Sequence, residues 1–133
     1  MTASNTINET ERTAIVHQVL DGLRTQNRDL LKTSLTDDAI WSIPGTSLIS
    51  GEARGIEAIV GRAKRLADFG LTISLKMILL GSHGVLISLH NQAHRGLAAL
   101  DESVAVVCQL RDGKICALDS YVSDLEMINS FFV

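Results

Sequence analysis

The chain has 133 residues, which fits one domain and is long enough to bury a core without disulfides or a structural metal. Hydrophobic residues make up 46% of the sequence and charged residues 20%, a composition that excludes a disordered protein. The formal net charge is −3 and Lys and Arg do not cluster, so nucleic acid is not an expected partner.

The N-terminal segment lacks the basic start and apolar run of a signal peptide, and no apolar stretch reaches the length of a bilayer span. We therefore expect a cytoplasmic protein that makes no contact with a membrane.

Helical periodicity dominates the first half of the chain. Thr6 and Glu9 have the spacing of a capping box, and apolar residues then recur every three or four positions. A short strand is expected over residues 39–43, where Pro44 ends it because proline has no N–H to donate to a ladder. The predicted helices cover residues 8–25, 29–35 and about 56–67.

After Gly70 the period of the pattern changes to two, as in strands with one buried face. Asp112 and Gly113 form the expected turn of the last hairpin. The predicted strands cover residues 71–77, 85–93, 103–110 and 115–122, and a short helix or tail is expected at 125–132.

Helices in one half and an antiparallel meander in the other indicate an α+β protein. An antiparallel sheet with one apolar face must curl over the helices to bury that face. We therefore expect a cone, in which a strongly curved antiparallel sheet wraps around three helices of the N-terminal half. The open end of such a cone is a natural ligand site.

The alternation also predicts which side chains line the cone, and most of them are apolar. Trp41 and Ile43 are expected to join the lining from the first strand. The inward residues of the later strands are expected to be Ile73, Leu75, Met77, Ile87, Leu89, Asn91, Val104, Val106, Cys108, Cys116, Leu118 and Ser120. Polar candidates are few, and they are Asn91, Glu102, Ser120 and His17.

Each candidate has a functional and a structural interpretation. Trp41 either stacks on a flat ligand or fills the core. Glu102 is either a buried general base or a solvated carboxylate at a strand end. His17 either exchanges a proton with a ligand or lies half-exposed at the edge of its helix. Asn91 and Ser120 either orient a ligand carbonyl or bond to the neighbouring backbone.

The sequence indicates no cofactor and no metal. Cys108 and Cys116 are expected to be buried free thiols, and no His lies at metal-ligand spacing from them. No phosphate-binding glycine motif occurs. The opposite face of the sheet is semi-polar, and a second copy of the chain is its simplest cover.

Three stretches carry a resemblance to a known family. They are residues 38–45 (D-A-I-W-S-I-P-G), residues 50–59 (S-G-E-A-R-G-I-E-A-I), and residues 111–115 (R-D-G-K-I) followed by Tyr121 and Asp124. The chain resembles the SnoaL-like members of the nuclear transport factor 2-like superfamily, which also holds ketosteroid isomerases and limonene epoxide hydrolases. The resemblance implies a cystatin-like roll over residues 1–133 as a single domain, an interior pocket, and commonly a homodimer through the outer sheet face.

The catalytic residues of those relatives do not carry over. The base of the isomerases falls on Ile43, their protonated aspartate near Val106 and their tyrosine near Val19. The last-strand aspartate of the epoxide hydrolases falls on Ser120, and the nearby Asp119 is one residue away, on the opposite face of the strand.

Two functional hypotheses follow. The first is a SnoaL-like protein that binds a largely apolar, ketone-type or polycyclic ligand and acts on it as an isomerase, cyclase or hydrolase, with Glu102 or His17 as the catalytic base. The second is a binding or dimerisation module without chemistry.

Overall fold

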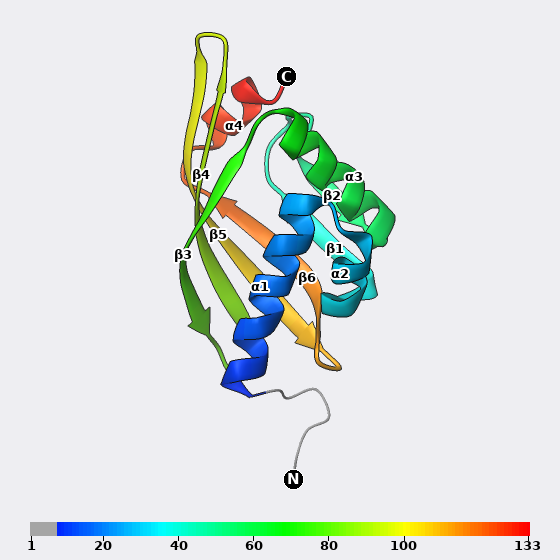
Figure 1. Ribbon diagram of the computed structural model, residues 1–133. Coiled ribbons are helices and arrows are strands. Elements are labelled where there is room, and N and C mark those ends of the chain that lie inside the picture. The colour runs from blue at the N-terminus through cyan, green and yellow to red at the C-terminus, as the bar shows by residue number, and fades with distance from the viewer. Residues whose placement is uncertain (1–7) are drawn as a thin grey trace.

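The computed structural model describes residues 8–133, and over that range it contains four helices and one six-stranded sheet (Figure 1). The helices are α1 (Glu9–Thr25), α2 (Arg28–Ser34), α3 (Gly55–Asp68) and α4 (Leu125–Phe131). The strands are β1 (Leu35–Ile43), β2 (Gly51–Arg54), β3 (Thr72–Leu80), β4 (Gly84–Arg95), β5 (Ala98–Arg111) and β6 (Lys114–Val122). The predicted α+β class is confirmed.

The strand order of the sheet is β2-β1-β6-β5-β4-β3. Strands β3 to β6 form the predicted antiparallel meander, but β1 pairs with β6 in parallel. The sheet is therefore mixed, and the expectation of a purely antiparallel sheet was wrong. A parallel pair needs a long crossover, and here the whole of α3 and the meander separate the two strands.

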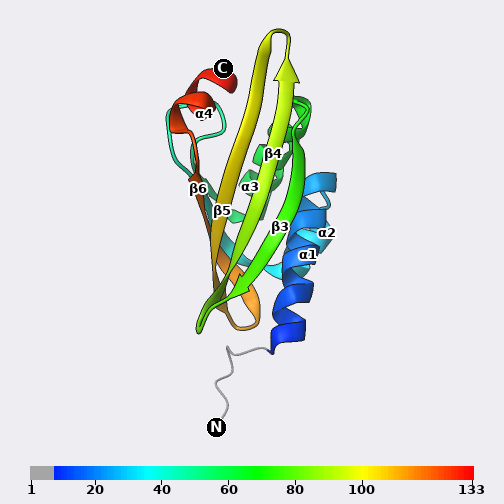
Figure 2. The ribbon, with the colours of Figure 1, turned by 90° about the vertical axis from the view of Figure 1, so that its left-hand side faces the viewer.

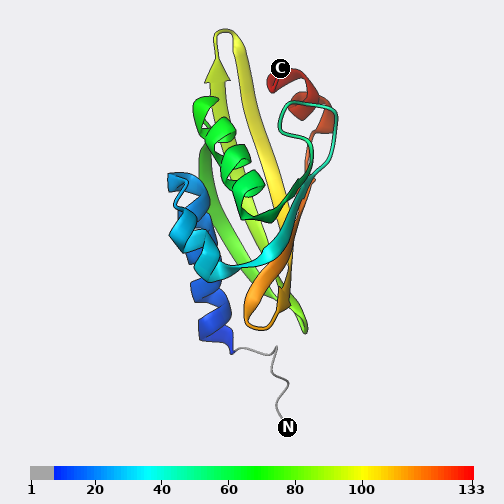
Figure 3. The ribbon, with the colours of Figure 1, turned by 90° about the vertical axis from the view of Figure 1, so that its right-hand side faces the viewer.

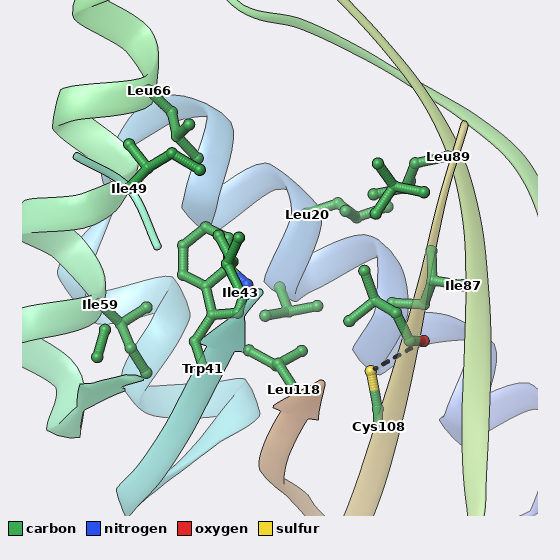
Figure 4. Packing of buried hydrophobic residues seen from close by; sticks show 14 of the residues in the cluster. Leu20, Trp41, Ile43, Ile49, Ile59, Leu66, Ile87, Leu89, Cys108 and Leu118 are labelled. Atoms are coloured by element: carbon green, nitrogen blue, oxygen red, sulfur yellow. Dashed lines mark hydrogen bonds between the residues drawn. The ribbon is translucent and has the colours of Figure 1, made fainter. Parts of the chain in front are cut away.

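Helices α1, α2 and α3 lie against one face of the curved sheet, and none of the helices in residues 8–133 covers the opposite face of strands β3 to β6 (Figures 1 and 2). The covered face supplies the core, because alternate residues of the strands are buried, such as Val85, Ile87 and Leu89 on β4. The helices contribute side chains at helical spacing, such as Val16 and Leu20. Side chains from both layers meet in Figure 4.

The N-cap of α1 differs from the prediction by two residues. Thr6, the predicted cap, lies outside the described residues. The N-cap is Asn8, whose side chain accepts from the backbone N–H of Glu11 at 2.8 Å, and the Glu11 carboxylate accepts from the backbone N–H of Asn8 at 3.4 Å. The same capping chemistry is therefore present two residues further along the chain.

Bulges change the predicted inward face at two positions. The register of β3 against β4 shifts between Leu75 and Met77, which leaves Met77 53% exposed and turns Ile78 toward the core. The register of β5 against β6 shifts between Gln109 and Leu110. Cys116 is therefore only half-buried, while the preceding Ile115 is fully buried. A bulge adds one residue to one strand and so reverses the alternation beyond it.

The short strand β2 was not predicted. Its four residues, G-E-A-R, carry no apolar alternation, and only Ala53 is buried. Pairing with β1 gives the segment its extended shape, and Gly51 and Gly55 at its ends have φ of 94° and 85°, which glycine adopts readily.

Helix α4 packs on the loop that follows β1 (Figure 3). The Asn129 side chain accepts from the Thr46 N–H at 2.7 Å, and the Phe132 carbonyl accepts from the Leu48 N–H at 3.0 Å. Phe131 and Phe132 form an aromatic cluster with Phe69, with ring centroids 5.0 to 6.1 Å apart. The C-terminal segment is thereby held beside α3. Of the helices in residues 8–133, none is both long and apolar enough to cross a bilayer.

Candidate ligand-binding cavity

A cavity of about 390 Å³ lies between the helices and the covered face of the sheet. Its volume is in the range of small-molecule sites. Most of its lining is apolar, with residues from α1, α3, α4 and all the strands except β2. All six residues that the sequence predicts as ligand-binding line it: Trp41, Ile43, Asn91, Val106, Leu118 and Ser120.

Three exposed residues mark where the cavity opens. Arg24 ends the lining on α1, Ala67 lies near the end of α3, and Thr72 begins β3. The Arg24 guanidinium donates to the Ile73 carbonyl at 2.9 Å and lies 3.7 Å from the Asp21 carboxylate. The opening is therefore polar, while the interior behind it is apolar.

Trp41 forms a fixed wall of the cavity (Figure 4). The indole is 8% exposed, and its Nε1–H donates to the Ser120 hydroxyl at 3.2 Å. The Arg62 guanidinium lies 5.2 Å from the ring centroid and donates to the Trp41 carbonyl at 2.6 Å. We call Trp41, Ser120 and Arg62 the indole wall. Its contacts hold the ring in one orientation.

Arg62 also secures the start of β2, because it donates to the Gly51 carbonyl at 2.9 Å. Burial lowers the pKa of Arg62, and the nearby Arg65 lowers it further. Sequence reasoning missed this residue. Arg62 lies three positions after Ile59 and four before Leu66, so its place on the apolar stripe of α3 was a usable signal.

Glu102 is the one fully buried carboxylate of the described chain, with 0% of its surface exposed, and it lines the cavity from β5. Its Oε1 accepts from the Asp124 N–H at 3.0 Å and from the Ser123 hydroxyl at 3.2 Å. Its Oε2 has no hydrogen-bond partner within residues 8–133. Of the two interpretations of Glu102, burial is therefore the one that the structure supports.

Burial raises the pKa of Glu102, while the hydrogen bonds from Asp124 and Ser123 act in the opposite direction. The carboxyl group therefore keeps its proton to a higher pH than an exposed glutamate does. A carboxyl with such a pKa can donate a proton when neutral and accept one when ionised.

The second cavity residue with an unpartnered polar atom is Asn91. It lies directly opposite Glu102 in the register of β4 and β5, and its Oδ1 is buried without a hydrogen-bond partner within residues 8–133. The side chain was predicted to face inward, and its place in the cavity lining agrees with that register.

The structure does not bring His17 to the cavity. Its neighbours Val16 and Val19 are buried, but His17 itself is exposed on α1 and does not belong to the lining. The structural interpretation, a residue at the edge of the helix, fits this placement better than proton exchange with a bound ligand.

Cys108 is buried, and burial raises its pKa to about 12. A thiol with that pKa stays protonated, so Cys108 is not a nucleophile at neutral pH. Within residues 8–133, no group of three or more His, Cys, Asp or Glu side chains is placed to hold a metal ion.

Comparisons with known proteins give the fold. The sequence matches no protein-family model, and no curated protein matches it significantly. Among solved structures, Bal32a from a soil-derived mobile gene cassette is similar, with a TM-score of 0.84, 23% identity, and coverage of 93% of this chain and 98% of that one. An NTF2-like protein from Burkholderia xenovorans LB400 has a TM-score of 0.81 and 16% identity, over 96% and 100% of the two chains.

An LEH-like epoxide hydrolase from M. tuberculosis is also similar, with a TM-score of 0.69 and 21% identity, over 92% and 90% of the two chains. Structures of the same fold further include proteins described as an isomerase and as a SnoaL-like polyketide cyclase. The protein therefore has the nuclear transport factor 2-like fold of the SnoaL-like proteins, also described as cystatin-like. The predicted resemblance is confirmed at the level of the fold.

Proposed function

We propose that the protein binds a small, largely apolar molecule in the cavity and that Glu102 is the acid–base group acting on it. The observation that carries this proposal is a fully buried carboxylate, with one free oxygen, in an otherwise apolar space of about 390 Å³. Buried carboxylates without a cation are uncommon, and such groups with shifted pKa values concentrate at functional sites.

The reaction that fits this site is proton transfer without a cofactor, on a ketone-type or polycyclic ligand. Asp124 and Ser123 hold Oε1, which leaves Oε2 to take a proton from the ligand and return it elsewhere. The indole wall provides a flat apolar surface against which the ligand stays oriented. Isomerisation and cyclisation use such a step, and in hydrolysis the same carboxylate takes the proton from an attacking water molecule instead.

A second candidate function is ligand binding without chemistry. It is favoured by the residues at the positions where related enzymes carry their catalytic groups, since Ile43, Val106 and Val19 have no proton to exchange and Ser120 is a weak acid. All four line the cavity. In this case the ligand stays unchanged and stabilises the fold by mass action.

Hydrogen exchange in 2-decalone, a bicyclic ketone, separates the two functions. If Glu102 removes protons next to the carbonyl, the protein accelerates deuterium uptake from D2O, and Glu102→Gln abolishes the acceleration. The matched control is Asp101→Asn, which changes the neighbouring exposed carboxylate and should leave the rate unchanged. Binding of 2-decalone without accelerated exchange supports the second function, and absence of binding contradicts both.

We also propose a homodimer through the uncovered face of the sheet, in the cytoplasm. Val107 is 38% exposed and Tyr121 59% exposed on that face, which is the pattern of an apolar patch that a partner covers. Val107→Asp should convert the dimer to a monomer in light scattering after gel filtration. A wild-type protein that is monomeric at micromolar concentration would contradict this proposal.

A further inference from the structure

Two fully buried side-chain polar atoms of the cavity have no hydrogen-bond partner within residues 8–133, and both are oxygens. They are Asn91 Oδ1 and Glu102 Oε2, and each is buried. Buried polar atoms are almost always paired, because an unpaired atom loses its bonds to water without replacement. The two oxygens therefore mark a place where a partner is missing.

The two side chains are neighbours. Asn91 and Glu102 are directly opposed in the β4–β5 register, and side chains opposed in this way lie about 5 Å apart at Cβ. Both line the cavity, so the space in front of them is the ligand space. We call this pair the acceptor pair.

Other polar atoms of the interior accept hydrogen bonds from within the protein. Ser120 accepts from Trp41, and Glu102 Oε1 accepts from Asp124 and Ser123. The carboxyl group of Glu102 thus has one oxygen fixed by the protein and the other free. A bound molecule with a hydrogen-bond donor finds unoccupied acceptors at the acceptor pair.

We propose that the acceptor pair is a subsite for a hydroxyl group on a largely apolar ligand. This inference rests on the proposed function, because it assigns a ligand class to the same cavity. A hydroxyl group both donates and accepts, so its proton can bond to Asn91 Oδ1 while its oxygen accepts from a neutral Glu102. An ether or ketone oxygen cannot donate and leaves Asn91 Oδ1 unpaired.

Burial favours the neutral carboxyl by raising the pKa of Glu102, which agrees with this arrangement. When Glu102 is ionised, the hydroxyl donates to one lone pair of Oε2, and the second lone pair of that oxygen remains to accept a proton. A donor on the ligand is therefore required in both protonation states.

Three bicyclic probes with one body and different substituents test the proposal: naphthalene, 2-methoxynaphthalene and 2-naphthol. We expect 2-naphthol to bind about tenfold more tightly than 2-methoxynaphthalene, which corresponds to one or two net hydrogen bonds. Because 2-naphthol is the better hydrated of the two, this preference cannot come from the hydrophobic effect. Dissociation constants are measured by isothermal titration calorimetry at neutral pH.

Asn91→Leu keeps the approximate shape of the side chain and removes its oxygen. In this variant the preference for 2-naphthol should fall to about twofold or less, while naphthalene binds at least as well as before. The control is Gln92→Leu, which makes a similar change on the exposed side of β4 and should keep the full preference. If Asn91→Leu does not fold, the ranking of the three probes by their affinity for the wild-type protein still tests the hydroxyl subsite.

The outcomes separate the two proposals. Equal affinity of the wild-type protein for 2-naphthol and 2-methoxynaphthalene overturns the hydroxyl subsite and leaves the proposed function standing. A preference that survives Asn91→Leu also overturns it. Failure of all three probes to bind contradicts ligand binding in the cavity, and with it both proposals.

Discussion

The indole wall and the acceptor pair are two regions of one cavity, and they differ in how their hydrogen bonds are completed. In the indole wall, Trp41 Nε1, the Trp41 carbonyl and the Arg62 guanidinium all bond within the protein. In the acceptor pair, Asn91 Oδ1 and Glu102 Oε2 are left free. The first region is therefore bonded internally, and the second is the one that we propose recognises a ligand.

The largest effect is expected from the centre of the indole wall. Trp41→Ala removes the largest buried side chain of the wall together with its bond to Ser120, and should lower the free energy of unfolding by about 3–5 kcal/mol. Urea unfolding followed by far-UV circular dichroism measures it. A loss below about 1 kcal/mol would show that the indole is not part of the rigid structure.

A smaller loss of stability is expected from replacing Arg62, the cation that contacts Trp41 in the indole wall. Arg62→Met keeps the apolar stem but leaves the Trp41 and Gly51 carbonyls without their donor, so unfolding should become easier by about 2 kcal/mol. The comparison variant is Lys64→Met on the exposed side of the same helix, which should change stability by less than about 0.5 kcal/mol. Equal changes in the free energy of unfolding for the two substitutions would show that Arg62 does not stabilise the indole wall.

The smallest effect concerns the acceptor pair and depends on pH. Because folding raises the pKa of Glu102, its contribution is fully present below the pKa of an unfolded glutamate, about 4.3, and is lost as the pH rises through the folded pKa. Glu102→Gln cannot ionise, so its Tm relative to wild type should rise by about 2–5 °C between pH 4 and pH 7.

Thermal unfolding at each pH gives this difference, with Glu126→Gln as the exposed control on α4. A relative Tm of Glu102→Gln that is constant or falls over this range would mean that folding does not raise the pKa of Glu102.

Much of this fold follows from the periodicity of the sequence. The helices, the antiparallel meander and the Asp112–Gly113 turn are local features, and local pattern predicted them. The parallel pairing of β1 with β6 depends on which distant strands meet, and the bulge at Met77 depends on how β3 fits β4. Neither leaves a signal in a short window of sequence.

The cavity lining likewise combines features that a local sequence pattern predicts with features that depend on the assembled fold. Alternation placed Trp41, Asn91 and Ser120 in the lining correctly, because each lies on a regular stretch of strand. It could not decide whether Glu102 is buried, since its hydrogen-bond donors come from Ser123 and Asp124, about twenty positions further along the chain. Burial of a charged side chain is a property of the assembled fold.

The most direct measurement of the central claim is a titration of the Glu102 carboxyl carbon by 13C NMR, assigned by comparison with Glu102→Gln, with and without saturating naphthalene. We predict a midpoint above about 4.3, the ordinary glutamate pKa, that moves when the probe fills the cavity. A midpoint at or below the ordinary value, unchanged by naphthalene, would contradict a buried carboxyl group facing a ligand cavity.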